Sequence, residues 1–372
     1  MSLTAFLKTS KANLIETASR LSKLTLVTGN QSSDMDSVVS AIAYSYFTKP
    51  SDTPILPLLN IPRADLGLRR DIEYALKLID IQAEDLIFAD DLHFLPRNIR
   101  LNLVLVDHNK PEGENEEMIL KAFNTHVTAI IDHHDDEHLF LHAEPRLIQV
   151  TGSCSSLVLG HFQKGVLNAK LDLATVKFLV SAILLDTGFL TDKYKTKQTD
   201  VDILNHIKAQ YPELSDEELS QENTILHKQK KSVEGFNFKD ILRKDYKEYN
   251  CGKLKTGISS VSGSLDQLEA TFGYQNMVQD LKELKGQRNL SLMVMMASYN
   301  SKSNNVHCRQ MVLVGDANSA LSSDTAAALE NKLQLEVKVS SSSEEIKAFE
   351  QLNTAASRKQ VAPLITEYLK SV

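Results

Sequence analysis

Residues 127–134 read Val-Thr-Ala-Ile-Ile-Asp-His-His, an apolar run that ends in an acid and two histidines. A second apolar run, Thr25-Leu-Val-Thr-Gly, leads into a loop that reads Asn30-Gln-Ser-Ser-Asp34-Met-Asp36-Ser. Both patterns are typical of buried strands that end in side chains able to bind a metal ion. Two such strand ends in one domain predict a metal site made of carboxylates and imidazoles.

The fold class follows from how these runs are spaced in the first half of the chain. Strands are predicted by the apolar runs at 24–28, 54–59, 103–107 and 127–132, and helices by the periodic patterns at 37–48, 65–80, 154–164 and 172–185. Strands that are apolar throughout and separated by helices favour a parallel sheet covered on both faces. Ligands of such α/β sheets bind beyond the carboxyl ends of the strands, where the acids of this chain fall.

The length of 372 residues exceeds what one ordinary hydrophobic core supports, so we expect two domains. The first, residues 1–195, holds the candidate metal site. Residues 196–230 are rich in charge, and we expect a solvated helical linker there. Alternating apolar runs resume at 254–261 and 290–297, which predicts a smaller α/β domain over 231–372.

Composition excludes several classes of function. A net charge of −7 argues against a general nucleic-acid-binding protein. No segment holds about 18 uninterrupted apolar residues, so we expect no membrane span. Three scattered cysteines without a CxxC pair, and an N-terminus without the apolar core of a signal peptide, favour a reducing, cytoplasmic location.

Further acids lie at the ends of other predicted elements. Asp107 ends the run Leu103–Val106, and Asp186 follows the apolar helical stretch 178–185. Alternatives remain for each acid alone, because Asp36 or Ser37 could cap the next helix and Asp107 could form a turn. Together with Asp34 and the histidine pair, these acids predict a dinuclear site with cations about 3.5–4 Å apart. A GxxxxGK[ST] phosphate loop and a cysteine cluster are both absent, which disfavours a P-loop NTPase and a structural zinc site.

Basic residues that could bind substrate phosphates occur in both halves of the chain. Arg63 lies in a stretch that also holds Arg69 and Arg70, Lys247 lies in the second block, and the pair Arg358-Lys359 precedes the last predicted helix. Arginine gives bidentate phosphate contacts and lysine a point charge. For any one of them, a solvated surface position is the alternative.

At this point the motifs resemble a known superfamily. GNQSSDMDS at 29–37, VDHN at 106–109, DHH at 132–134 and LLDT at 184–187 are similar, in order and spacing, to the DHH phosphoesterases. Asp245-x-Lys247 and Ser357-Arg358-Lys359-Gln360 resemble the C-terminal domain that family-II pyrophosphatases share with cytosolic exopolyphosphatases. Stretches such as NIPRADLGLRRD, at 60–71, look most similar to fungal (yeast-type) exopolyphosphatases. The resemblance covers nearly the whole chain.

The resemblance implies roles for single residues. It implies a metal-ligand set for two divalent ions, Mg²⁺ or Mn²⁺ with Co²⁺ as a further candidate: Asp34, Asp36, Asp107, His133 and Asp186. It implies phosphate binding by a second set of residues: His134, Lys247, Arg358 and Lys359, with Arg63 and Asn30 as further substrate-binding positions. Of these, His134, Arg358 and Lys359 are also implied to be catalytic, and Asp107 is implied to take part in catalysis through the metals. Asn30 stands where family-II pyrophosphatases have histidine, and we expect this departure to favour Mg²⁺ over Mn²⁺.

The activity implied by the resemblance is exopolyphosphatase, in which a metal-bridging hydroxide releases terminal phosphate from linear inorganic polyphosphate. The second domain would close over the active site, and we expect a monomer with no partner besides polyphosphate. Inorganic pyrophosphatase and prune-like (cyclic) nucleotide phosphodiesterase remain alternatives on the same fold. A catalytically weak regulatory binding protein is an alternative of another class.

Overall fold

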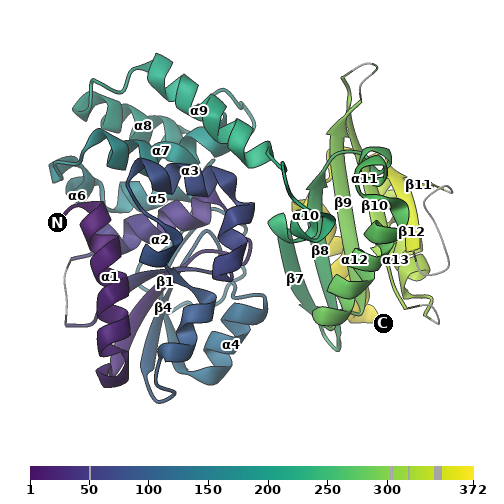
Figure 1. Cartoon of the computed structure of the whole chain (residues 1–372), viewed down its shortest axis with the longest axis horizontal. Helices are drawn as coiled ribbons and strands as arrows, with labels where there is room; N and C mark the ends of the chain where they lie inside the picture. Colours follow the sequence, from purple (N-terminus) through teal and green to yellow (C-terminus); the bar gives the residue numbers. More distant parts are fainter. Residues whose placement is uncertain (50–51, 302, 304, 317–318, 339–345) are drawn as a thin grey trace. The chain divides into compact units, whose positions relative to one another are not determined.

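The computed structural model describes residues 1–49, 52–301, 303, 305–316, 319–338 and 346–372. The chain divides into two compact units, Met1–Ser232 and Val233–Val372 (Figure 1). Each unit has its own sheet and its own hydrophobic core, so each is described by itself.

The N-terminal unit is built on a six-stranded sheet in the order β3-β2-β1-β4-β5-β6. Every neighbouring pair of strands is parallel, as the sequence predicts. The strands are β1 (Lys23–Thr28), β2 (Ile55–Leu59), β3 (Ile87–Phe88), β4 (Arg100–Val106), β5 (Asn124–Asp132) and β6 (Arg146–Ile148). The short outer strands β3 and β6 were not predicted, because runs of two and three residues carry no periodic signal.

Helices cover both faces of this sheet (Figure 1). They are α1 (Leu3–Thr17), α2 (Met35–Phe47), α3 (Arg70–Leu78), α4 (Glu114–Ala122), α5 (Cys154–His161), α6 (Gln163–Asn168), α7 (Leu173–Thr187), α8 (Gln198–Gln210) and α9 (Asp216–Lys231). Along β4, Leu103 and Leu105 join one core, whereas Val104 and Val106 join the other. This alternation explains why the strands are apolar throughout, and it confirms the predicted doubly covered sheet.

The charge-rich segment 196–230 forms α8 and α9, and both pack on the N-terminal unit. Leu204 of α8 and Leu219 and Leu226 of α9 are buried in the same core as α2, α3 and α7. Several charged side chains of these helices, such as Asp202, Glu217 and Lys228, are exposed, whereas Asp200 and Glu222 are buried.

The C-terminal unit holds a mixed sheet in the order β11-β12-β10-β9-β8-β7. Only the β8–β9 pair among these strands is parallel. The strands are β7 (Tyr246–Cys251), β8 (Leu254–Ser262), β9 (Leu292–Asn300), β10 (His307–Val314), β11 (Leu335–Val337) and β12 (Ile346–Gln351), and the helices are α10 (Phe238–Lys244), α11 (Leu265–Phe272), α12 (Tyr274–Gln287), α13 (Leu321–Leu333) and α14 (Arg358–Ser371). Separate cores lie on its two faces, which confirms a second α/β domain.

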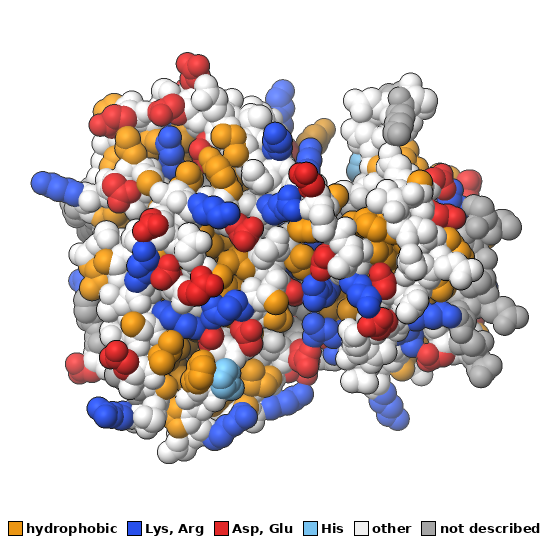
Figure 2. Space-filling view, viewed as in Figure 1, with side chains coloured by type: hydrophobic (Ala, Val, Ile, Leu, Met, Phe, Trp, Pro, Cys, Tyr) orange, Lys and Arg blue, Asp and Glu red, His pale blue; other side chains and the backbone are white. Residues whose placement is uncertain are grey.

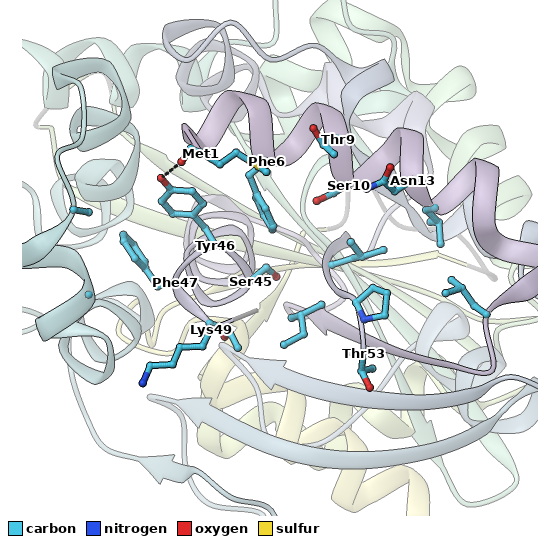
Figure 3. Close-up of a pocket in the computed structure, with 18 residues that line it drawn as sticks. Met1, Phe6, Thr9, Ser10, Asn13, Ser45, Tyr46, Phe47, Lys49 and Thr53 are labelled. Atoms are coloured by element: carbon cyan, nitrogen blue, oxygen red, sulfur yellow. Dashed lines mark hydrogen bonds between the residues drawn. The ribbon is translucent and has the colours of Figure 1, made fainter. Parts of the chain in front are cut away.

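A cavity of about 600 Å³ lies at the amino end of β2, between α1 and the C-terminal end of α2 (Figure 3). Phe6, Tyr46 and Phe47 line it, and the Tyr46 hydroxyl donates to the carbonyl of Met1 at 2.9 Å. Because the candidate metal ligands follow the carboxyl ends of the strands, this cavity lies at the other end of the sheet from them.

The visible face of the N-terminal unit carries acidic and basic side chains in alternation, without a large area of one sign (Figure 2). Among the described helices, none is both long enough and apolar enough to cross a membrane.

A buried ion cluster on Asp91 fastens α1 to the rest of the N-terminal unit. Oδ2 of Asp91 contacts the Lys11 ammonium, accepts from the Arg63 guanidinium at 2.6 Å and accepts from the Phe88 N–H at 2.9 Å. Burial alone would raise the pKa of Asp91, but these donors hold that pKa below its usual value. The ionised form of Asp91 is therefore stabilised in the folded state.

We predict that Asp91→Asn lowers the unfolding free energy of the N-terminal unit by about 3 kcal/mol, because buried cations lose their counter-charge. The folded-state pKa is depressed, so the stabilisation is full above the unfolded-state pKa, near about 4. It is lost as the pH falls through the folded-state pKa. Urea unfolding followed by circular dichroism measures both effects, since the chain contains no tryptophan.

The control is Lys8→Met, which removes the exposed Lys8–Asp80 pair at 3.0 Å. Exposed pairs contribute about 0–1 kcal/mol, so this change should be small at every pH. Equal losses in the two variants would contradict a special role for the Asp91 cluster.

Candidate metal centre

Asp107 stands at the centre of the polar cluster beyond β4. Its φ of +61° is unusual for a residue other than glycine, and such strain is concentrated at functional sites. Oδ2 of the buried Asp107 accepts from the Ser37 hydroxyl at 2.6 Å and from the Asn30 amide at 2.7 Å. Oδ1 lies 3.2 Å from Nε2 of His133.

Asp36 lies in the first turn of α2 and is 4% exposed. Its carboxylate accepts from the Ser153 hydroxyl at 2.7 Å and from the N–H groups of Cys154 and Ser155, at 2.6 and 2.8 Å. These are the first N–H groups of α5, which have no partner within their own helix and favour a negative charge. Nε2 of His133 lies 3.9 Å from Oδ2 of Asp36, so this acid also faces the Asp107 cluster.

Asp34 is the residue that caps α2, rather than Asp36 or Ser37. One carboxylate oxygen of Asp34 accepts from the Ser37 N–H at 3.2 Å. Just before this loop, Gly29 passes so close to α2 that an added Cβ would lie 2.3 Å from Cβ of Ser37. Only glycine therefore allows the loop that carries the two acids to leave β1 at this angle.

The two histidines that follow β5 are held by different partners. Nδ1 of His133 lies 3.0 Å from the carbonyl oxygen of Thr151, and a carbonyl can only accept, so this nitrogen carries the proton. Nδ1 of His134 lies 2.8 Å from a carboxylate oxygen of the buried Asp132. The centres of the two rings are 4.6 Å apart, and the ring planes are nearly perpendicular.

The charges of the acids act on one another. Burial, reinforced by Asp107 and Asp186, raises the pKa of Asp36 well above its usual range. Burial likewise raises the pKa of the half-buried Asp186 to about 6, and Asp34 and Asp107 add to this shift. Burial would also raise the pKa of Asp107, but the neighbouring His133 and His134 and the Ser37 hydroxyl hold that pKa well below its usual range. These mutual effects show that Asp34, Asp36, Asp107, Asp186 and His133 lie within electrostatic range of one another.

The donor set fits a divalent cation. One possible ligand atom from each of Asp107, His133 and His134 lies within 4.8 Å of the others. Carboxylates and a neutral imidazole suit Mg²⁺ or Mn²⁺, and the carbonyl bonded to Nδ1 of His133 fixes the tautomer that presents Nε2 to a metal. A cation would also offset the crowded negative charge described above.

Asn30 contacts the cluster through its amide nitrogen. Its oxygen accepts from the N–H and the hydroxyl of Ser32, at 2.9 and 2.7 Å, while its nitrogen donates to Asp107. Asn30 thus holds Asp107 in place in this structure, and its expected contacts with substrate and its effect on metal choice stay predictions.

The predicted phosphate-binding residues of the second unit form a group of their own. The Arg358 guanidinium, at the start of α14, donates to the carbonyl of Asp245 at 2.9 Å and to its carboxylate at 2.5 Å. Asp245 directly precedes β7, which carries Lys247. Lys359 is exposed beside Arg358. Their roles with substrate stay predictions.

Arg63 is engaged elsewhere in the N-terminal unit. Its guanidinium donates to Asp91 and to the carbonyl of Leu86 at 3.3 Å, and it lies 4.5 Å from the ring centre of Phe88. These contacts give Arg63 a structural partner set, and its expected contact with substrate stays a prediction.

Sequence reasoning did not identify which residues hold the candidate ligands in place. Asp132, predicted only as an acid at a strand end, contacts Nδ1 of His134 and accepts from the Asn109 amide at 2.6 Å. Thr151 and the segment 153–155 hold His133 and Asp36. The signal for this segment was the run Thr151-Gly-Ser-Cys-Ser-Ser, whose small polar residues offer several hydrogen-bond donors just before a helix.

Comparisons with known proteins agree with this arrangement. The N-terminal domain of the DHH family matches residues 25–208, and the DHHA2 domain matches residues 224–368. A Schizosaccharomyces pombe protein named "Putative exopolyphosphatase" is 33% identical over 97% of this chain and 95% of its own length. The human "Exopolyphosphatase PRUNE1" is 29% identical over 94% of this chain and 76% of its own length.

The fold also has a solved counterpart. A Methanococcus jannaschii structure described as a "putative family II inorganic pyrophosphatase" covers 94% of this chain and all of its own, with a TM-score of 0.62 and 19% identity. At this identity the likeness concerns the fold alone. With both of its domains matched and with a relative that is similar over nearly its whole length, the chain belongs to the DHH family.

Proposed function

We propose that this chain is a metal-dependent exopolyphosphatase, which releases orthophosphate from the end of linear inorganic polyphosphate. The observation that carries the proposal is the convergence of Asp36, Asp107 and His133 beyond the carboxyl ends of β1, β4 and β5. The exopolyphosphatase names of the fission-yeast and human relatives support this choice of substrate class.

Divalent cations bound here would supply positive charge for the phosphoryl oxygens and would make a water molecule more acidic. Asp34, Asp36, Asp107, His133 and Asp186 are the residues proposed to hold two of them. The chain's own part is to keep these donors fixed before substrate arrives. The hydroxyl of Ser37 and the first N–H groups of α5 do this for Asp107 and Asp36.

His134 is proposed to contact the transferring phosphoryl group. Asp132 holds its Nδ1, and about 30% of its side chain is exposed, against 11% for His133. A protonated imidazole in this setting can donate Nε2–H to a phosphate oxygen, whereas His133 directs its Nε2 toward Asp107 and Asp36. His133 is thereby suited to bind metal, and His134 is suited to contact phosphate.

The remaining phosphate charge is proposed to be met by the group around β7 and the start of α14. Asp245 holds the guanidinium of Arg358 through two oxygens, which fixes its orientation and supports a role in bidentate phosphate binding. Lys247 of β7 and Lys359, which follows Arg358 in the sequence, are proposed to add point charges.

Inorganic pyrophosphatase is the second candidate, because a Clostridium acetobutylicum relative named "Probable manganese-dependent inorganic pyrophosphatase" is 28% identical over 63% of this chain and 69% of its own length. The two activities require the same cluster and differ only in the length of the phosphate chain. A side-by-side assay of phosphate release therefore decides between them.

We predict that, with Mg²⁺ or Mn²⁺, the protein releases phosphate from long polyphosphate faster than from pyrophosphate, a nucleoside tetraphosphate or a cyclic nucleotide. Asp107→Asn, which keeps the size of the side chain, should lower the rate by more than about 100-fold because a metal ligand is lost. A malachite-green assay measures phosphate release from the first three substrates, and chromatography of the nucleoside monophosphate product measures hydrolysis of the cyclic nucleotide.

The matched control is Asp80→Asn, which changes an exposed aspartate whose side chain is 85% accessible. It should leave every rate unchanged. Faster release from pyrophosphate would favour the second candidate, and no release from any substrate would leave a binding protein as the better description.

We predict that the histidine pair separates metal binding from turnover. His133→Gln should lower Mn²⁺ affinity, because Nε2 is lost from a position 3.2 Å from Asp107. His134→Gln should retain Mn²⁺ affinity and lose most of kcat, because a phosphate donor is lost. Isothermal titration with Mn²⁺ and steady-state kinetics on polyphosphate give the two quantities, and similar behaviour of both variants would refute this division.

A further inference from the structure

One short segment of the N-terminal unit contacts two of the candidate metal ligands at once. We call it the 151–155 loop; it comprises the end of the connection from β6 and the first two residues of α5, and it is largely buried. At its start the Thr151 carbonyl holds Nδ1 of His133 at 3.0 Å. At its end Ser153, Cys154 and Ser155 supply the donors to Asp36. The position of this loop therefore sets the position of both ligands.

Asp200, in the first turn of α8, holds the loop from behind. It is 0% exposed. One carboxylate oxygen accepts from the Thr151 hydroxyl at 2.9 Å, the Ser156 hydroxyl at 2.6 Å and the Ser153 N–H at 3.3 Å. The other accepts from the N–H groups of Gly152 and Lys197, both at 2.8 Å. A buried carboxylate with this many donors is costly to disturb, because each donor would lose its acceptor.

Gly152 shows how tightly the loop is enclosed. A Cβ added there would lie 2.7 Å from a carboxylate oxygen of Asp200 and 2.6 Å from Cγ2 of Thr187. Thr187 directly follows Asp186, a third candidate ligand. The backbone of the loop thus runs between Asp200 and the end of α7, and it has no room to shift toward either.

Helix capping alone does not account for the burial and the hydrogen bonds of the Asp200 carboxylate. Only the bond from Lys197 belongs to the capping box of α8, and the other bonds go to residues 151–156. Glu218 has the corresponding place in the capping box of α9, where it accepts from the Ser215 N–H at 3.4 Å on an exposed surface. A cap of that kind needs neither burial nor contacts with a distant loop.

We infer that Asp200 is a positioning residue of the metal centre, which acts through the 151–155 loop on His133 and Asp36. The inference depends on the metal site of the proposed function. Asp200 fixes the Thr151 carbonyl that orients the His133 imidazole, and it fixes the donors that hold Asp36. Partners of this kind, one shell behind the ligands, typically contribute 10- to 100-fold to metal affinity.

Two substitutions of different severity test the inference. In Asp200→Asn the amide oxygen can face the N–H groups of Gly152 and Lys197 while its nitrogen donates to the Thr151 and Ser156 hydroxyls, so these hydroxyls change from donors to acceptors and the Ser153 N–H loses its acceptor. In Asp200→Ala every donor loses its acceptor. We expect Mn²⁺ affinity to fall by about 10-fold for the first and by up to about 100-fold for the second.

Isothermal titration of the full-length chain with Mn²⁺ measures affinity without any assay of turnover, and circular dichroism confirms that each variant is folded at the temperature used. Glu218→Ala is the control, since it removes a cap at the same helical position without touching the loop. It should lower the melting temperature slightly and leave Mn²⁺ affinity unchanged. If Asp200→Ala does not fold, Asp200→Asn decides the question.

The outcomes separate the two proposals. Wild-type protein that binds no Mn²⁺ would overturn the proposed function, and this inference with it. Wild-type binding with unchanged affinity in Asp200→Asn and Asp200→Ala would overturn the inference alone. An equal fall in Glu218→Ala would also overturn it, because any lost helix cap would then have the same effect.

Discussion

Repulsion among buried carboxylates is the constraint around which the N-terminal unit is organised. Asp36 and Asp107 are both nearly inaccessible to water, and neither could stay there as an isolated charge. The chain meets this cost by surrounding each acid with donors from separate elements: the hydroxyl of Ser37 and the amide of Asn30 for Asp107, and the N-terminus of α5 for Asp36. The relative positions of α2, α5 and the loop that follows β1 are therefore tied to the acids that they stabilise.

The backbone around these acids adopts unusual conformations and passes unusually close to its neighbours. Asp107 adopts a positive φ, and Gly29 and Gly152 stand where an added Cβ would lie within 3 Å of a neighbour. All three positions belong to connections that leave the carboxyl side of the sheet. Unusual backbone conformations and close approaches thus occur on the connections that carry the candidate site, as is common where a regular scaffold supports a functional site.

The sequence predicts the parts of this arrangement that depend on apolar periodicity. The prediction of 24–28 corresponds to β1 at Lys23–Thr28, because a continuous apolar run has few alternatives to a buried strand. The sequence also predicts that the acids that follow such strands lie close together, because the carboxyl ends of parallel strands meet at one edge of the sheet. The role of Asp200 could not be predicted in the same way. It lies in a charge-rich stretch with Lys195, Lys197 and Asp202, which predicts a solvated helix, and only the folded chain shows that this carboxylate faces the 151–155 loop. Hydrogen-bond partners distant in sequence carry no periodic signal.

The histidine pair shows how two adjacent, identical residues acquire different properties. Beyond the end of β5 the chain leaves the regular strand, and the rings of His133 and His134 are nearly perpendicular. A neutral carbonyl bonded to Nδ1 of His133 leaves a lone pair on Nε2 in the tautomer that a metal requires. At His134 the partner of Nδ1 is instead a buried carboxylate, which places negative charge behind the ring. The chemistry of each histidine is therefore decided by the partner of its inner nitrogen, and those partners, the Thr151 carbonyl and the Asp132 carboxylate, come from different parts of the chain.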